Sequence, residues 1–148
     1  MTRSLGTHPH VTDMSWAYRR PLKFQIGDEK ADSLVACASA VSLNDDGRRL
    51  LPAGTLLNKI TSGAHTGMHG PYDPTKSNGQ QTLTAGTSYV LVESHDVTYG
   101  DKPVAGYFMD CVFDVTQVAD SGAAGTPISK HGAALTALKA AFPQCVFQ

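Results

Sequence analysis

The amino-acid sequence predicts a mostly β fold of the α+β class. We expect an extended N-terminal arm over residues 1–21 and a single β-rich domain over residues 22–148, built as a compact β-barrel or sandwich with a C-terminal amphipathic helix. Short apolar stretches rich in β-branched and aromatic residues recur between Gly, Pro, Asn and Asp turns. Residues 104–116 alternate with the period of a strand. Apolar residues at helical spacing follow residue 126.

Length and charge limit the classes of protein to consider. The chain has 148 residues, about one domain, which is long enough to bury a core without disulfides or metal. It carries 12 basic and 13 acidic side chains. This balance argues against nucleic acid as a partner, because binding through phosphates needs a concentrated basic face. We find no signal peptide and no run of about 18 apolar residues, so we expect a soluble chain with no membrane partner.

Residues 1–21 are predicted to form an arm outside the core, because they show no sustained apolar periodicity. The arm contains the only tryptophan, Trp16, close to Tyr18, Arg19 and Arg20. Aromatic and arginine side chains are enriched in protein interfaces. We therefore interpret these four residues as a contact site for another protein, with a frayed terminus as the alternative.

The first part of the domain is predicted to contain two strands and a turn. Residues 22–26 alternate apolar and polar side chains, and we expect Gly27 and Asp28 to end this strand. Residues 33–43 are apolar and small, which predicts a buried strand. The Asn-Asp-Asp-Gly sequence at 44–47 predicts a turn, because Asn and Gly accept positive φ angles.

Further strands are expected on both sides of a long loop. One begins at Leu50, is broken by Pro-Ala-Gly at 52–54, and resumes over residues 55–60. Residues 61–87 are rich in Gly, Pro, Thr and Asn, and a loop of this length is either functional or partly strand-like. Residues 88–96 then predict a core strand centred on Tyr-Val-Leu-Val.

The clearest strand is predicted at residues 104–116, after a turn over 98–103. Asp110 and Asp114 fall on one face of it. The other face carries the apolar side chains Tyr107, Met109, Cys111, Phe113 and Val115. This alternation predicts that one face is directed toward the core and the other toward solvent.

The amphipathic helix is expected at about 127–142, after a flexible linker over 119–125. Thr126 is suited to cap the helix, and Pro127 fits its first position, where a missing N–H costs nothing. Pro143 ends it. Its apolar stripe comprises Ile128, Leu135, Leu138 and Phe142.

His65 and His69 have H-x-x-x-H spacing, which on a helix brings two imidazoles to one side, as zinc sites require. Gly63 and Gly67 disfavour a helix here, and no Glu follows the first histidine. No third metal-ligating residue lies at a spacing typical of a zinc site. We therefore expect ordinary loop histidines, with no metal and no cofactor.

No catalytic residue is predicted. The odd number of cysteines and the absence of C-x-x-C spacing indicate reduced thiols. Cys37 and Cys111 fall in apolar strands and are interpreted as small buried hydrophobes, while nothing near Cys145 would lower its pKa. The sequence contains no nucleophile elbow and no glycine-rich phosphate loop. We expect the acidic residues to lie on solvent-exposed faces and not to form a catalytic acid/base pair.

The middle of the chain resembles a known family. Residues 52–63 read PAGTLLNKITSG, and GPYDP at 70–74, SNGQQT at 77–82 and the strand YVLV at 89–92 follow. This succession is similar to the head decoration proteins of tailed bacteriophages, the group typified by the phage lambda decoration protein. In that family a Gly-x-x-Leu-x-Lys-Ile-Thr strand leads into a tyrosine-containing loop, an Asp/Asn-Gly turn and a hydrophobic strand. The resemblance covers about residues 50–118.

The resemblance implies a non-enzymatic capsid decoration (cement) protein with a β-rich decoration domain. Such proteins bind as homotrimers at three-fold positions on the outside of an expanded capsid and stabilise it against the pressure of packaged DNA. The implied partners are the major capsid protein and further copies of this chain. The implied location is the outer capsid surface of the virion, after synthesis in the host cytoplasm. The four arm residues Trp16, Tyr18, Arg19 and Arg20 would belong to a capsid-binding arm.

The sequence leaves two alternatives open. The chain differs from the usual family sequence over residues 84–89, and its arm and helix are longer than in the shortest members. The first alternative is another virion module, such as a fibre-associated or head–tail connector piece. A small hydrolase is the second alternative, with Cys111 or a loop histidine at its active site.

Overall fold

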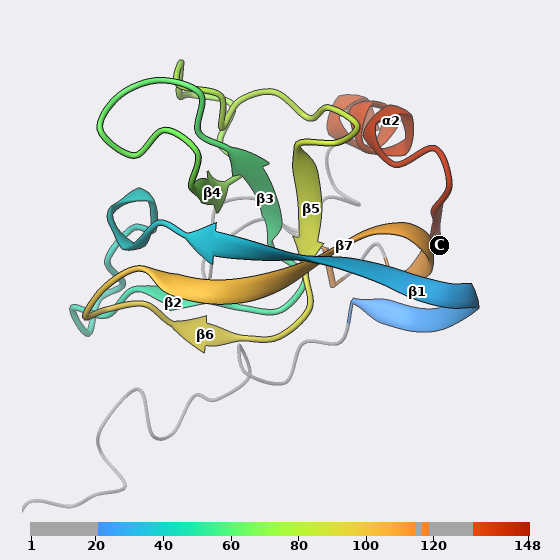
Figure 1. Ribbon diagram of the computed structural model, residues 1–148, viewed down its shortest axis with the longest axis horizontal. Coiled ribbons are helices and arrows are strands. Elements are labelled where there is room, and N and C mark those ends of the chain that lie inside the picture. Colours follow the sequence, from blue (N-terminus) through green and yellow to red (C-terminus); the bar gives the residue numbers. More distant parts are fainter. Residues whose placement is uncertain (1–20, 115–116, 119–131) are drawn as a thin grey trace, which may run out of the picture.

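The computed structural model describes residues 21–114, 117–118 and 132–148, and its main feature is a closed five-stranded β-barrel (Figure 1). The hydrogen-bonded order is β1-β4-β3-β5-β7, and pairing between β7 and β1 closes the barrel. The barrel strands are β1 (Leu22–Ala36), β3 (Leu56–Lys59), β4 (His69–Pro71), β5 (Ser88–Leu91) and β7 (Lys102–Phe113). The predicted mostly β fold is therefore confirmed.

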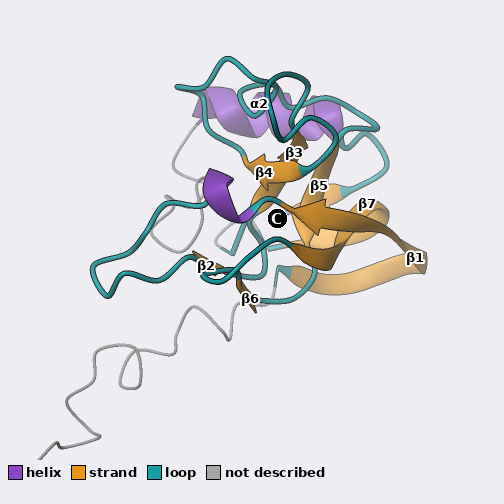
Figure 2. Ribbon diagram, turned by 60° about the vertical axis from the view of Figure 1, so that its left-hand side comes forward, coloured by secondary structure: helices purple, strands orange, loops and turns teal. Residues whose placement is uncertain are grey.

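The remaining elements lie around this barrel. A two-stranded ribbon pairs β2 (Leu50–Leu51) with β6 (His95–Asp96), and a single-turn 3-10 helix, η3 (Ala38–Ala40), follows β1. The C-terminal helix α2 (Gly132–Ala141) precedes β8 (Val146–Phe147), which pairs in parallel with the end of β7. The ribbon and α2 lie on opposite sides of the barrel in both views (Figures 1 and 2).

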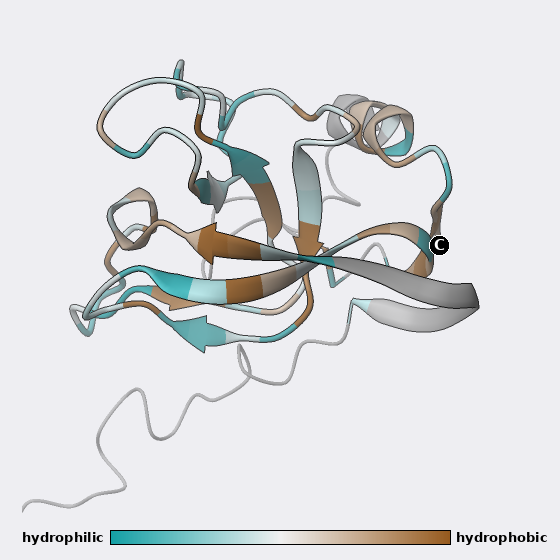
Figure 3. Cartoon of the chain, in the orientation of Figure 1, coloured by the Kyte–Doolittle hydropathy of each residue, from teal (hydrophilic) through white to brown (hydrophobic). Residues whose placement is uncertain are grey.

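The central strands β3 and β5 are buried on both faces. Leu56 and Val90, which are register partners, belong to a core cluster that includes Phe142 and residues of α2. Their chain neighbours Leu57 and Leu91 belong to a second cluster, formed with residues of β1, β2 and β7. In Figure 3 the lower parts of β3 and β5 are brown, whereas the arrowhead of β3 and strand β6 are teal. Burial on both faces explains why apolar residues stand next to each other in these strands, as Leu56 and Leu57 do in β3 and Val90 and Leu91 do in β5.

Helix α2 packs on the first cluster through the second half of the predicted stripe, while the side chains of Ile128 and Leu135 lie outside the described residues. Leu138 and Phe142 are buried there, and the helix ends at Ala141, just before Pro143, as expected. The described part of the helix begins at Gly132. The predicted start of the helix and the linker before it, residues 119–131, lie outside the described residues.

The prediction that Gly27 and Asp28 end the first strand is wrong, because β1 continues to Ala36. The register places residues 26–29 opposite the single residue Asp110 of β7. The strand therefore bulges at this point instead of ending, and glycine and aspartate suit a bulge as well as a turn. Gly27 and Asp28 therefore mark a change in the register of the strand and not its end.

The predicted buried strand over residues 33–43 is also wrong beyond Ala36. Strand β1 ends there, η3 follows, and Leu43 is 56% exposed. Val35 is 44% exposed, whereas its neighbour Leu34 is buried. This part of β1 therefore has one solvent face. An apolar run in a sequence does not reveal which of its faces another element will cover.

The long segment 61–87 is partly strand-like, because it contains β4. Buried polar side chains hold the rest of it against the barrel. Ser88 Oγ donates to Asn58 Oδ1 at 2.6 Å, and Asn58 Nδ2 donates to the Gln80 carbonyl at 2.8 Å. Gln80 Nε2 in turn donates to the Pro71 carbonyl at 2.9 Å. These satisfied buried groups order a segment that lacks apolar periodicity.

The core face predicted for the last long strand is confirmed in part, but strict alternation is not kept, because Val112 on the predicted solvent face is also buried. Tyr107, Cys111 and Phe113 are buried together in the first cluster. Met109 is only half-buried. Asp110 has a positive φ of 56° at the point where β1 bulges. The predicted core residue Val115 lies outside the described residues.

Candidate functional site

The predicted contact residues Trp16, Tyr18, Arg19 and Arg20 lie outside the described residues. The description of the chain begins at Pro21, the last residue of the predicted arm, which is buried. What the structure describes is therefore the place where the predicted arm would join the barrel.

This junction, which we call the arm root, consists of Pro21, Gly54, Asp114 and Gln117. The backbone N–H of Asp114 donates to the Pro21 carbonyl at 2.7 Å. Gly54 has a φ of +85°, and a Cβ at this position would lie 2.1 Å from the carbonyl oxygen of Gln117 and 3.2 Å from Pro21 Cβ. Only glycine fits such an approach. The arm root gives residues 1–20 a fixed point of attachment on the barrel.

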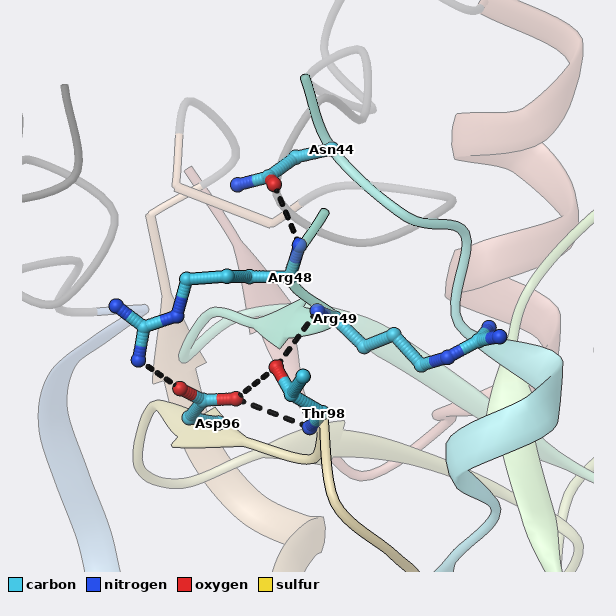
Figure 4. Close-up of polar contacts among 5 residues, drawn as sticks. All are labelled: Asn44, Arg48, Arg49, Asp96 and Thr98. Carbon is cyan, nitrogen blue, oxygen red and sulfur yellow. Dashed lines mark hydrogen bonds and ion pairs between the residues drawn. The ribbon is translucent and has the colours of Figure 1, made fainter. Parts of the chain in front are cut away.

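A second organised region is the polar cluster at the end of the β2–β6 ribbon (Figure 4). Asn44 Oδ1 accepts a hydrogen bond from the backbone N–H of Arg48 at 2.9 Å, and the Arg48 guanidinium forms an ion pair with Asp96. Asp96 Oδ1 also accepts from the backbone N–H of Thr98 at 3.0 Å. The Thr98 hydroxyl oxygen accepts from the backbone N–H of Arg49 at 2.9 Å. The cluster ties together two loops that are distant in sequence.

The charge of Asp96 is favoured in this cluster. Partial burial acts to raise the pKa of its carboxyl group, but hydrogen bonds from Thr98 and the bond and charge of Arg48 outweigh that effect. The net result is a pKa below the usual value. The ion pair is therefore present at neutral pH, where it fixes the two loops relative to each other.

The two loops held by this cluster present the two most exposed large hydrophobic side chains among those that the structure describes. Tyr99 is 98% exposed, at the turn after β6, and Leu43 lies in the loop before β2. An exposed tyrosine is suited to contact another protein, because aromatic side chains are enriched in interfaces. The sequence did not indicate them, because Leu43 lay in a predicted buried strand and Tyr99 in an unremarkable turn.

A shallow groove of about 360 Å³ runs along the outer face of the β1–β7 pair. Its lining includes Ser33, Val92 and Pro103. The exposed side chain of Val35 lies two residues beyond Ser33, on the same face of β1. Glu93 and His95 also line the groove, so its surface is mixed in polarity.

The two histidines of the H-x-x-x-H spacing lie in different surroundings. His69 is on β4, where its ring packs edge-on against Tyr89 with centroids 5.4 Å apart. Its Nδ1 atom is buried and has no hydrogen-bond partner among the described residues. Burial, followed by the positive charge of Lys59, lowers the pKa of His69. The prediction of a loop histidine is wrong for His69 and correct for His65, which lies exposed between β3 and β4.

His65 is instead brought to Ser39 and Cys37. The Ser39 hydroxyl lies 3.1 Å from His65 Nε2 and 3.2 Å from Cys37 Sγ. All three residues line a cavity of about 350 Å³. Chemically, this is a hydroxyl hydrogen-bonded to an imidazole at the mouth of a small cavity. Sequence reasoning missed Ser39, because nothing in the sequence links residues that are 26 positions apart.

The other two cysteines have structural surroundings. Cys111 is fully buried in the first cluster, and its thiol lies 3.1 Å from the Met109 carbonyl oxygen. Burial raises the pKa of the Cys145 thiol, in spite of a hydrogen bond from the Cys111 backbone. Both thiols are therefore poor nucleophiles, as the sequence predicts.

Within residues 21–114, 117–118 and 132–148, no three His, Cys, Asp or Glu side chains gather as a metal site would require. No helix in these ranges has the length and apolar character needed to cross a membrane.

Comparison with known proteins gave no relatives: no protein-family model, curated protein or solved structure matches this chain.

Proposed function

We propose that this chain is a head decoration (cement) protein of a tailed bacteriophage. In this role it binds as a homotrimer to the outside of an expanded capsid at three-fold positions. It bridges neighbouring copies of the major capsid protein and stabilises the shell against the pressure of packaged DNA. The work is done by docking, and no side chain needs to perform chemistry.

One observation carries the proposal: residues 52–92, whose sequence resembles the decoration proteins, also form neighbouring strands of the barrel. The stretch 55–60 supplies β3, GPYDP contributes to β4, and YVLV contributes to β5. Strand β3 pairs with both β4 and β5. The resemblance therefore rests on one continuous piece of structure and not on scattered turns.

The arm root supports a docking role for the arm. Because Pro21 is held between Gly54 and the backbone near Asp114, the arm starts from a defined place on a rigid body. An extended arm can add to an exposed sheet edge on a capsid protein and gain main-chain hydrogen bonds there. Three arms on one trimer act at high effective concentration, so each contact can be weak.

The closed barrel supports the same role. Closure leaves the barrel strands themselves without a free edge, so copies of the chain are protected from uncontrolled edge-to-edge pairing. Association then depends on the arm and on side chains that the barrel holds in place, such as Tyr99 and Leu43.

The direct test is to mix the purified full-length chain with expanded, undecorated phage shells and to image them by electron microscopy. We expect extra density at the three-fold positions and a rise in the temperature at which the shells break. Three versions of the chain should be compared. The first is wild type, the second carries Trp16→Ala, Tyr18→Ala, Arg19→Ala and Arg20→Ala, and the third is a control with Thr2→Ala, Ser4→Ala and Thr7→Ala.

We expect the first substituted version to lose shell binding and the control version to keep it. Equal binding by both would show that the aromatic–arginine cluster is not the contact site. A monomeric chain that ignores expanded shells would contradict the decoration role and favour another virion module.

A further inference from the structure

The cavity that contains Ser39 and His65 has no part in the docking role proposed above. Its volume of about 350 Å³ lies at the lower end of the range for small-molecule sites. Its walls come from η3, from the loop between β3 and β4, and from residues 76–80. Each wall is held in place by hydrogen bonds that do not involve the cavity side chains.

Hydrogen bonds to residues outside the cavity hold the wall that carries Ser39. The backbone N–H of Ala38 donates to Asp101 Oδ1 at 2.7 Å, and the Arg49 guanidinium donates to the carbonyl of Val41. The N–H of Cys37 donates to the His69 carbonyl at 2.9 Å. These bonds hold the single turn of η3, and with it the backbone of Ser39.

The wall that carries His65 is equally defined. The Ile60 N–H donates to the Met68 carbonyl, and the Gly67 N–H donates to the Ile60 carbonyl, both at 2.8 Å. The Thr66 hydroxyl donates to the Gly63 carbonyl at 2.7 Å. These bonds close the loop around His65, so the imidazole reaches Ser39 from a fixed backbone.

The donors and acceptors in this cluster can form one directed chain. The thiol of Cys37 can donate to Ser39 Oγ, and the Ser39 hydroxyl can then donate to the unprotonated Nε2 of His65. The two distances, 3.2 Å and 3.1 Å, are within hydrogen-bond range. A hydroxyl that donates to an imidazole is the arrangement that activates a serine nucleophile. Lys76 adds a positive side chain to the cavity lining, which favours negative charge developing on a bound carbonyl oxygen.

We propose that Ser39 is a nucleophilic hydroxyl, with His65 as its general base, and that the cavity accepts small carboxylic esters. Ser39 Oγ attacks the ester carbonyl carbon, its proton passes to His65 Nε2, and the bond to the leaving alkoxide breaks. The alkoxide takes the proton from His65 and departs as an alcohol. Ser39 is left acylated, and water then releases the carboxylic acid or the acyl group remains as a modification.

The test uses the purified full-length chain and p-nitrophenyl acetate. Release of p-nitrophenol is followed by absorbance, and the acetylated residue is identified by digestion and tandem mass spectrometry. A fluorophosphonate probe, which loses fluoride to an activated serine, gives a second readout. We expect one acetyl group per chain, on Ser39, formed faster than in the urea-denatured chain.

Two variants and two matched controls decide the assignment. Ser39→Ala should remove the adduct, and His65→Gln should slow acylation by about 10²-fold or more, the usual contribution of a general base. Ser33→Ala and His95→Gln change a serine and a histidine that do not line the cavity. Both controls should react like wild type. Thermal melts of all four confirm that the fold is kept.

Three results would overturn the proposal. The first is acylation of Ser39→Ala at the wild-type rate, and the second is a folded chain that reacts no faster than the denatured one. The third is an adduct on Cys37, which hydroxylamine would remove as a thioester. None of these results bears on shell binding, so this proposal and the decoration role stand or fall separately.

Discussion

Phe113 lies at the centre of the cluster beneath α2 and is fully buried. Its ring stacks on Phe147 with centroids 5.3 Å apart and packs against Tyr107 at 6.0 Å. We expect Phe113→Ala to lower the free energy of unfolding by about 3–5 kcal/mol, the usual cost of truncating a buried aromatic residue. Urea denaturation measures this cost. Tyr99→Ala, at an exposed position, is the control and should change stability by less than about 0.5 kcal/mol.

Gly54 offers a test of the arm root. Gly54→Ala combines a positive φ with a Cβ that overlaps the Gln117 carbonyl. Gly86 has nearly the same φ, +86° against +85°, but open space around it. We expect Gly86→Ala to cost about 1 kcal/mol from backbone strain alone, and Gly54→Ala to cost clearly more, because the root itself must move. Equal costs by denaturation would show that the close approach is not a constraint.

His69 should make stability sensitive to mild acid. Burial and Lys59 lower its pKa in the folded chain, so the unfolded chain binds a proton first as pH falls below about 6.5. The free energy of unfolding should therefore decrease between neutral pH and the lowered pKa of His69. His69→Gln should flatten this decrease in urea titrations at a series of pH values.

At the scale of elements, the β2–β6 ribbon depends on a polar cluster more than on its length. Each of its strands has only two residues, and Asp96 joins them to the flanking loops through Arg48 and Thr98. We expect Asp96→Asn to cost about 1 kcal/mol near neutral pH, since the pair is partly exposed. Asp45→Asn, in the same region but on an exposed loop, is the matched control.

The cost of Asp96→Asn should disappear in acid. The folded pKa of Asp96 is lowered, so its contribution is present above the unfolded value of about 3.9 and is lost as pH falls through the folded pKa. Unfolding curves of wild type and variant should therefore converge at low pH. A difference that persists there would mean that the carboxylate charge is not what holds the ribbon.

The whole molecule should assemble without its arm. The barrel, its two core clusters and α2 are built from residues of the described ranges, and the proposed arm contacts belong to the shell. We expect a chain shortened to residues 21–148 to keep the circular dichroism spectrum and the trimeric mass in sedimentation equilibrium, while binding to expanded shells drops. A shortened chain that unfolds or becomes monomeric would assign the arm to the core or to the trimer interface.

The candidate sites differ in how far the sequence revealed them. The composition of the predicted arm suggests Trp16 and its neighbours as a contact site, and this stays a prediction because these residues lie outside the described ranges. The pairing of Ser39 with His65 could not be predicted. It depends on a 3-10 turn and a hairpin loop that meet only after the barrel has closed.

The sequence by itself determined the β-rich class, the turn at 44–47, the core face of β7 and the end of α2. Each of these follows from local periodicity or from the backbone preferences of Gly, Asn and Pro. Tertiary structure alone decided that β1 bulges past Gly27, that Leu43 is exposed, and that His69 is buried on a strand. The physical reason is that strand pairing and burial depend on which distant segment covers a face, and local sequence carries no record of that partner.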